Sequence, residues 1–222
     1  MKKLMVPTLW RSVLLAVTLC LSAGTVAEES VLGERFVAGT HYEVLEIAVD
    51  TSDADKVEVV EMFSYACIHC FNFDPFVKSW HARQPDDVDF YAVPAIFNSD
   101  WELLAQAFYT SETLGVTDQV HDRMFEGIHT LNEDLRQAGV LAPIFEELAG
   151  VNELDFNAAY KSFSVRSRVQ QAKALVRAYK ITGVPTMIVN GKYRIDGRMA
   201  GGNAKMIEVV DFLVAKERQS QQ

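Results

Sequence analysis

The chain has 222 residues, 49% of them hydrophobic, with 21 basic and 30 acidic side chains and a formal net charge of −9. This length suits one domain, or one domain with an insertion. The negative charge argues against a nucleic-acid-binding protein, because nucleic-acid phosphates would repel such a surface.

The first 27 residues have the features of a secretory signal peptide. A basic segment, MKKLMVPTLWR, is followed by the apolar run SVLLAVTLCLSAG, and the small residue Ala27 precedes the acidic EES. The apolar run is shorter than the ~20 residues that a membrane-spanning helix needs. We therefore expect cleavage after Ala27 and export, rather than a retained membrane anchor. Removal of residues 1–27 would take three basic side chains away and leave 18 against 30 acidic ones.

The use of cysteine is more informative than the charge. Cys20 lies within the predicted signal peptide, so the exported chain keeps only Cys67 and Cys70. Disulfides persist in the oxidising compartments that exported proteins reach, but a bridge that closes so small a loop constrains the unfolded chain very little. A disulfide-stapled scaffold would contain four or more cysteines. The pair therefore predicts redox chemistry rather than a structural staple.

The first half of the exported chain predicts a βαβ unit. We expect a buried strand over 57–65, because VEVVEMFSY is rich in Val and aromatic residues. Apolar residues at helical spacing predict an amphipathic helix over 67–84, with a kink near Asn72 to Asp74 caused by Pro75. A second strand is expected over 88–97, and the two strands should then be parallel with a right-handed connection.

The second half predicts a helical block followed by a hairpin and a helix. Five segments between residues 101 and 179 have helical spacing, and none has a strand pattern. TMIVNGKYRID, 186–196, predicts a β-hairpin that turns at Asn190 and Gly191, and 203–218 predicts a closing amphipathic helix. This order favours an α/β domain of four or five strands, formed by 28–98 and 180–222, with an inserted all-helical subdomain over 99–179.

Cys67 and Cys70 are expected to play different chemical roles. Cys67 should lie at the N-terminus of the helix, where unpaired N–H groups and the helix dipole stabilise an anion. A thiolate there has a lowered pKa and is the attacking sulfur. Cys70, one turn later, should lie on the inner side and resolve a mixed disulfide. His69, between the two, would stabilise the thiolate further.

A zinc site is the main chemical alternative for the pair. Structural zinc needs four ligands and catalytic zinc usually three, yet the sequence has no second CxxC and no HxxxH pattern. The remaining histidines are scattered singly, and we interpret each as an ordinary surface or partly buried residue: His41, His81, His121 and His129. We expect no metal and no cofactor.

Two carboxylates flank the cysteines. Glu61 stands within the apolar strand, which predicts a buried acid with a raised pKa. Asp74 follows Cys70 by one helical turn and lies on the same face, where an acid near Cys70 could take part in proton transfer; a surface charge is the competing interpretation. Pro185 directly precedes a predicted strand, a position at which proline starts a strand or marks a bend.

The motifs FSYACIHC and GVPTMIVNGKY, with the helical block between them, resemble the DsbA family of periplasmic thiol:disulfide oxidoreductases, within the thioredoxin superfamily, over about residues 40–215. The resemblance implies a thioredoxin-like fold and an enzyme that donates the Cys67–Cys70 disulfide to newly exported proteins through a mixed disulfide at Cys67. Ile68 and His69 would set the redox poise.

The resemblance also implies the surroundings of the disulfide. Pro185 would be a cis-proline that faces it, and Val184 would offer backbone hydrogen bonds to an extended substrate. Glu61 and Asp74 match the family's buried acids. Two departures bear on the redox potential: Ile68 stands where proline is common, and the segment 88–97 lacks the lysine that often accompanies the acids.

The implied partners are reduced exported proteins and a DsbB-like, quinone-linked oxidase of the inner membrane. The implied location is the periplasm, and we expect a monomer. Two alternatives remain open: a periplasmic disulfide reductase or isomerase, and a non-catalytic thiol-based module that binds peptides or a metal. Cys67→Ser would abolish the activity of an oxidase and leave a peptide-binding groove largely intact.

Overall fold

A computed structural model describes residues 35–221 of the chain; the predicted signal peptide lies outside the described residues. Five strands form one mixed sheet in the order β1-β5-β4-β2-β3. Their bounds are Glu43–Val44 for β1, Val57–Phe63 for β2, Val88–Pro94 for β3, Thr186–Val189 for β4 and Tyr193–Asp196 for β5. β2 pairs with β3 in parallel, as expected of a βαβ unit, and β4 and β5 pair with their neighbours in antiparallel fashion.

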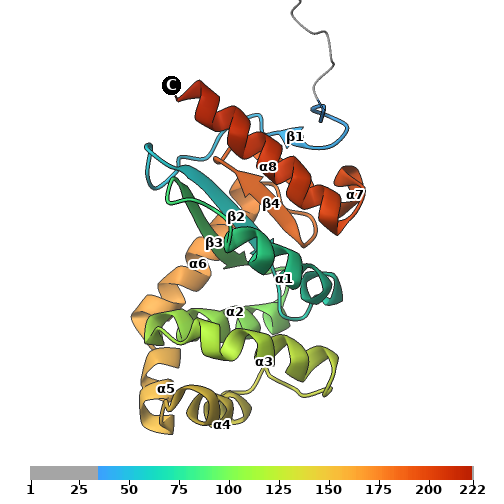
Figure 1. Ribbon diagram of the computed structural model, residues 1–222. Helices are drawn as coiled ribbons and strands as arrows, with labels where there is room; N and C mark the ends of the chain where they lie inside the picture. Colours follow the sequence, from blue (N-terminus) through green and yellow to red (C-terminus); the bar gives the residue numbers. More distant parts are fainter. Residues whose placement is uncertain (1–34, 222) are drawn as a thin grey trace, which may run out of the picture. The chain divides into compact units, whose positions relative to one another are not determined.

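The helix of the βαβ unit, α1, spans Ile68–His81 and begins directly after Cys67. Pro75 lies inside α1 without ending it. Phe73, Val77 and Trp80 point inward at the predicted helical spacing and are buried. With the closing helix α8, Asn203–Ser220, α1 covers one face of the sheet (Figure 1).

The β4–β5 hairpin turns at Asn190 and Gly191, as the sequence predicts. Both residues have positive φ, 51° and 63°, and the N–H of Lys192 donates to the carbonyl of Val189 at 3.0 Å. Such a turn favours Asn-Gly because both central residues adopt the left-handed region. A side chain at Gly191 would also collide with the carbonyl oxygen of Val49, 1.9 Å from the position of a Cβ atom.

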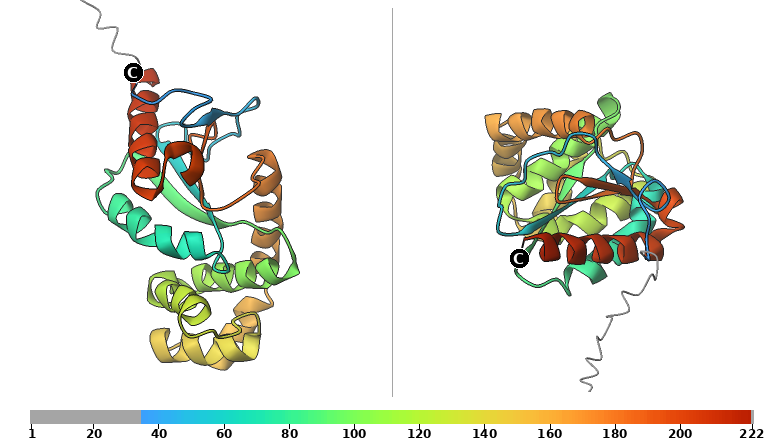
Figure 2. Two further views of the ribbon diagram at one scale, coloured as in Figure 1. Left: turned by 90° about the vertical axis from the view of Figure 1, so that its right-hand side faces the viewer. Right: turned by 90° about the horizontal axis from the view of Figure 1, so that it is seen from above.

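Five helices lie between β3 and β4 in the chain: α2 (Ser99–Leu114), α3 (Thr117–His129), α4 (Ala138–Ala149), α5 (Glu153–Tyr160) and α6 (Phe163–Ala178). Local signals set both ends of α2. The side chain of Asn98 accepts from Trp101 N–H at the start of α2, and Gly115 ends that helix in the left-handed region. Figure 2 shows α2–α5 gathered beyond one end of the sheet, with α6 running back alongside the sheet. Their apolar side chains share a core with Met62 and Ile188 of the sheet.

A short helix, α7 (Gly197–Ala200), joins β5 to α8. Within residues 35–221, no helix is both long enough and apolar enough to span a membrane.

Candidate active site

Cys67 occupies the N-cap of α1. Its backbone is extended, with φ −97° and ψ 113°, and its own N–H donates to the carbonyl of Ser64 at 3.0 Å. Its carbonyl oxygen accepts the first helical hydrogen bonds, from Cys70 and Phe71. β2 ends four residues earlier, so Cys67 lies just beyond the C-terminal end of this buried strand, where the helix begins. The position predicted for Cys67 is confirmed.

The surroundings of Cys67 lower its pKa to about 6. The largest cause is a hydrogen bond from the Cys70 thiol, which burial partly opposes. The backbone N–H groups of Cys70 and His69 also donate to the sulfur, and the charge of His69 adds a smaller contribution. These are the free donors of a helix N-terminus, which favour an anion. Cys67 is partly exposed, so a second molecule can reach its sulfur.

Cys70 has the opposite environment. Its side chain is fully buried in the core that the sheet shares with helices α2–α6. Burial raises the pKa of Cys70 far above its ordinary value, and the neighbouring Cys67 and Glu61 raise it further. Cys70 therefore holds its proton while Cys67 gives its proton up.

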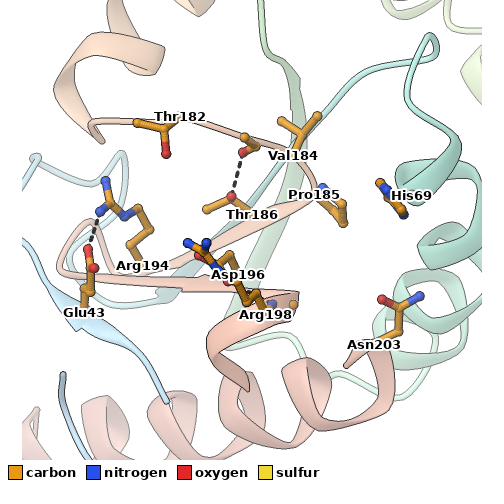
Figure 3. A pocket seen from close by; sticks show the side chains of 12 residues that line it. Glu43, His69, Thr182, Val184, Pro185, Thr186, Arg194, Asp196, Arg198 and Asn203 are labelled. Carbon is orange, nitrogen blue, oxygen red and sulfur yellow. Dashed lines mark hydrogen bonds and ion pairs between the residues drawn. The ribbon is translucent and has the colours of Figure 1, made fainter. Parts of the chain in front are cut away.

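The loop before β4 faces Cys67. The Val184–Pro185 peptide bond is cis, as the resemblance implies. Sγ of Cys67 lies 3.5 Å from the carbonyl oxygen of Val184, and the hydroxyl of Thr186 donates to the carbonyl of Gly183 at 2.8 Å. Beside this contact is a cavity of about 510 Å³, which Val184 and Pro185 line together with His69 (Figure 3). Exposed His69 thus borders both the thiol and the cavity.

The two flanking acids differ. Glu61 is only 7% exposed, and burial, reinforced by the charge of Asp74, raises its pKa to about 8. Burial also opposes ionisation of the partly buried Asp74, but hydrogen bonds from His121 and Lys78 outweigh it and hold the pKa of Asp74 below its usual value. The predicted burial and raised pKa of Glu61 are confirmed. Asp74, ionised at neutral pH, is poorly suited to proton transfer.

Sequence reasoning missed the groups around Asp74. Lys78 follows it by one helical turn, and Nζ lies 2.8 Å from a carboxylate oxygen; the i, i+4 spacing was an available signal. His121, on α3, contacts the other oxygen at 3.0 Å, and no local pattern distinguished it from the remaining histidines. The segment 88–97 does lack a lysine, but α1 supplies a cation to the acids itself.

The described residues contain no group of three or more His, Cys, Asp or Glu side chains that could hold a metal ion.

A low-pKa thiol at a helix N-terminus, a buried second thiol one turn later and a facing cis-proline loop define a thiol:disulfide oxidoreductase built on a thioredoxin-like fold. The chain belongs to the DSBA-like thioredoxin domain family, whose model matches residues 87–214.

Relatives cover nearly the whole chain. Thiol:disulfide interchange protein DsbA of Pseudomonas aeruginosa is 38% identical over 204 residues, 92% of this chain and 96% of the relative. DsbA of Azotobacter vinelandii is 40% identical over 210 residues, 94% and 96% of the two chains. The crystal structure of P. aeruginosa DsbA matches with a TM-score of 0.79 at 39% identity, over 83% of this chain and 96% of that one. The structure of oxidoreductase DsbA from Xylella fastidiosa gives 0.77 at 33% identity, over 83% and 98%. These matches confirm the predicted family and fold, and this chain is a protein disulfide oxidoreductase.

Proposed function

We propose that this chain oxidises pairs of thiols in proteins newly exported to the periplasm, by transferring the Cys67–Cys70 disulfide to them. The observation that carries the proposal is the opposite protonation of the two thiols: surroundings that lower the pKa of Cys67 to about 6 and raise that of Cys70. Stabilising the Cys67 thiolate stabilises the reduced enzyme, and a more stable reduced form makes the disulfide a stronger oxidant.

The reaction has two exchange steps. A substrate thiolate attacks Sγ of Cys67, the Cys67–Cys70 bond breaks, and Cys70 receives its electron pair and a proton. The second substrate thiolate then attacks the substrate sulfur in the mixed disulfide, and Cys67 leaves as a thiolate. Two electrons pass from substrate to enzyme. The two substrate thiols lose two protons in total. Cys70 gains one proton, and the other proton goes to solvent.

Glu61 is the proposed proton donor to Cys70. Glu61 is buried next to the Cys70 thiol, and a negative charge on Glu61 raises the pKa of that thiol. The pKa of Glu61 itself, about 8, keeps its carboxyl group protonated at neutral pH. A carboxylic acid with a pKa near the working pH is an efficient proton donor and acceptor. When the enzyme is reoxidised, the Glu61 carboxylate would take the proton back from Cys70.

The loop at Val184 and Pro185 is the proposed docking point for substrate. An extended chain aligned with Val184 would bring its cysteine to Cys67, because the Val184 carbonyl already lies 3.5 Å from that sulfur. Reoxidation would require a membrane oxidase of the DsbB type, and the protein would act as a monomer. The DsbB-type partner is the proposal that rests on the family to which the chain belongs.

The equilibrium constant of the cysteine pair with glutathione tests the proposal. The protein is equilibrated in glutathione buffers of graded composition, and its free thiols are counted after alkylation, with Cys67→Ser as the control that cannot form the disulfide. A disulfide that reduced glutathione opens readily supports a disulfide donor in which Ile68 is tolerated. A disulfide that stays closed until the buffer is strongly reducing would contradict the proposal and favour a reductase.

A further inference from the structure

A group of polar side chains links active-site helix α1 to α3 of the helical insertion. Oη of Tyr65 lies 2.9 Å from Nδ1 of His121, and Nε2 of His121 lies 3.0 Å from Oδ1 of Asp74. Nζ of Lys78 contacts the other oxygen of Asp74 at 2.8 Å and also pairs with Asp122 of α3. Both oxygens of Asp74 are therefore held, by partners on two different helices.

Glu61 lies beside this group. Alternate residues of a strand point to the same face, so Glu61 shares its face of β2 with Val59 and Phe63. The ring of Phe63 lies 5.8 Å from the His121 ring, and Val59 belongs to the core cluster that contains the inner side of α1. Glu61 therefore faces α1 and α3, and it responds to the charges of Asp74 and Lys78.

We infer that His121 is a positioning residue for the proton transfer at Cys70: together with Lys78 it fixes the Asp74 carboxylate beside Glu61. The inference rests on the proposed function, in which Glu61 exchanges a proton with Cys70. A fixed negative charge at Asp74 favours the protonated form of Glu61, because two adjacent carboxylates resist being ionised together. The insertion thus contributes to the chemistry of a thiol that lies outside it.

The charged groups around His121 come from several elements. Asp74 and Lys78 lie on α1, Asp122 is the next residue on α3, and Glu61 faces the group from β2. Glu112 of α2 influences Tyr65 and is paired with Arg168 at 2.7 Å. The rings of Phe63, Tyr65 and Phe125 also contact the imidazole. Among the described residues, Asp74 is the acid that hydrogen-bonds to His121.

A direct test is the titration of Glu61 in the reduced exported chain. Glutamate is labelled with ¹³C at the carboxyl carbon, and the Glu61 signal is assigned by its loss in Glu61→Gln. The expected midpoint is about 8 in the native sequence. In His121→Leu, which removes the imidazole donor and leaves Asp74 held by Lys78 alone, the midpoint should fall by on the order of one unit. His121→Gln should keep most of the native midpoint, because its amide can still donate to Asp74.

A matched control is His81→Gln, at the exposed C-terminal end of the same α1, which should leave the midpoint unchanged. An unchanged midpoint in folded His121→Leu would overturn the inference, and so would an equal shift in the Leu and Gln variants. If His121→Leu fails to fold, Asp74→Asn tests the step on which the role of His121 depends, the effect of the Asp74 charge on Glu61: it should also lower the midpoint, and no change there would overturn the inference.

Glutathione exchange measured on the same samples separates this inference from the proposed function. If reduced glutathione does not open the disulfide of the native protein, the proposed function is contradicted, irrespective of the Glu61 midpoint. Normal exchange with glutathione, together with a Glu61 midpoint that is unchanged in both the His121 and the Asp74 variants, would overturn the positioning role alone.

Discussion

The sulfur atoms of Cys67 and Cys70 belong to one turn of helix, but the regions of the molecule around them differ sharply. Around Cys67 lie backbone N–H groups, exposed His69 and the cavity beside the Val184–Pro185 loop. Around Cys70 lie the apolar core shared by the sheet and helices α2–α6, and a protonated acid, Glu61. The first region stabilises negative charge and the second penalises it.

This difference shows how one short motif produces a directional reaction. Because only Cys67 carries charge easily, the reduced pair is a thiolate and a thiol rather than two equivalent thiols. The attacking and leaving sulfur is then the one that a substrate can reach. The sulfur of Cys70 needs a proton whenever the disulfide opens. Glu61, the proposed donor of that proton, is an acid buried in the core.

Exchanging either cysteine for serine should give the largest effect. Cys67→Ser should abolish disulfide transfer, because the accessible sulfur is gone. Cys70→Ser should still form a mixed disulfide at Cys67 but fail to release it within the enzyme, so that adducts accumulate. Non-reducing electrophoresis and mass spectrometry after incubation with an oxidised peptide measure both. Adducts on Cys70 in the Cys67→Ser variant would contradict the assigned roles.

The titration of Cys67 should differ from that of an ordinary thiol by about three units, with a midpoint of about 6 instead of 9. Thiolate absorbance near 240 nm reports it directly. A depressed folded-state pKa stabilises the fold above the unfolded pKa, and this stability is lost as the pH falls through the folded value. The reduced protein should therefore gain stability between about pH 6 and 9, relative to Cys67→Ser. A midpoint near 9 would remove the basis for a strong oxidant.

The contribution of Glu61 to the stability of the fold should change with pH in the opposite direction to that of Cys67, and Glu61→Gln tests this. The folded-state pKa of Glu61 is raised to about 8 from 4.5, so its stabilising contribution is complete below about 4.5 and is lost as the pH rises through about 8. The glutamine variant should be more stable than the native reduced protein at pH 8, by roughly 2–4 kcal/mol, and not at pH 4.5. Urea unfolding at both values measures this. A difference independent of pH would mean that Glu61 is not a buried protonated acid.

Much of this architecture could be predicted because its causes are local. The buried strand β2, the helix that begins after Cys67 and the Asn190-Gly191 turn each depend on residues within a few positions. The predicted five helical segments likewise match α2–α6 in place. The two-residue strand β1 was missed, because Glu43 and Val44 are held by pairing with distant β5 and show no pattern of their own.

The missed site residues have the same explanation. Lys78 was detectable by its spacing from Asp74, but His121 is 47 residues from Asp74 and meets it only after α3 packs against α1. A single histidine on an amphipathic helix gives no sign of its partner. The opposite environments of Cys67 and Cys70 were predictable in sign, since one begins the helix and the other points inward. The group that fixes Asp74 depends on tertiary packing alone.

Substitution of His69 should have the smallest effect on the difference between the two thiols. Its charge is the last of the influences that lower the pKa of Cys67, behind the Cys70 thiol and the backbone N–H groups. His69→Gln leaves those donors in place, so the thiolate midpoint should rise by only roughly a few tenths of a unit. The absorbance titration used for Cys67 resolves such a change, with His81→Gln on the same helix as the control. A rise of more than one unit would assign control of the thiolate to the imidazole instead of the helix N-terminus. The difference in pKa between the two thiols would then depend on one exposed side chain. Other residues at position 69 would change the redox potential of the disulfide without altering the fold.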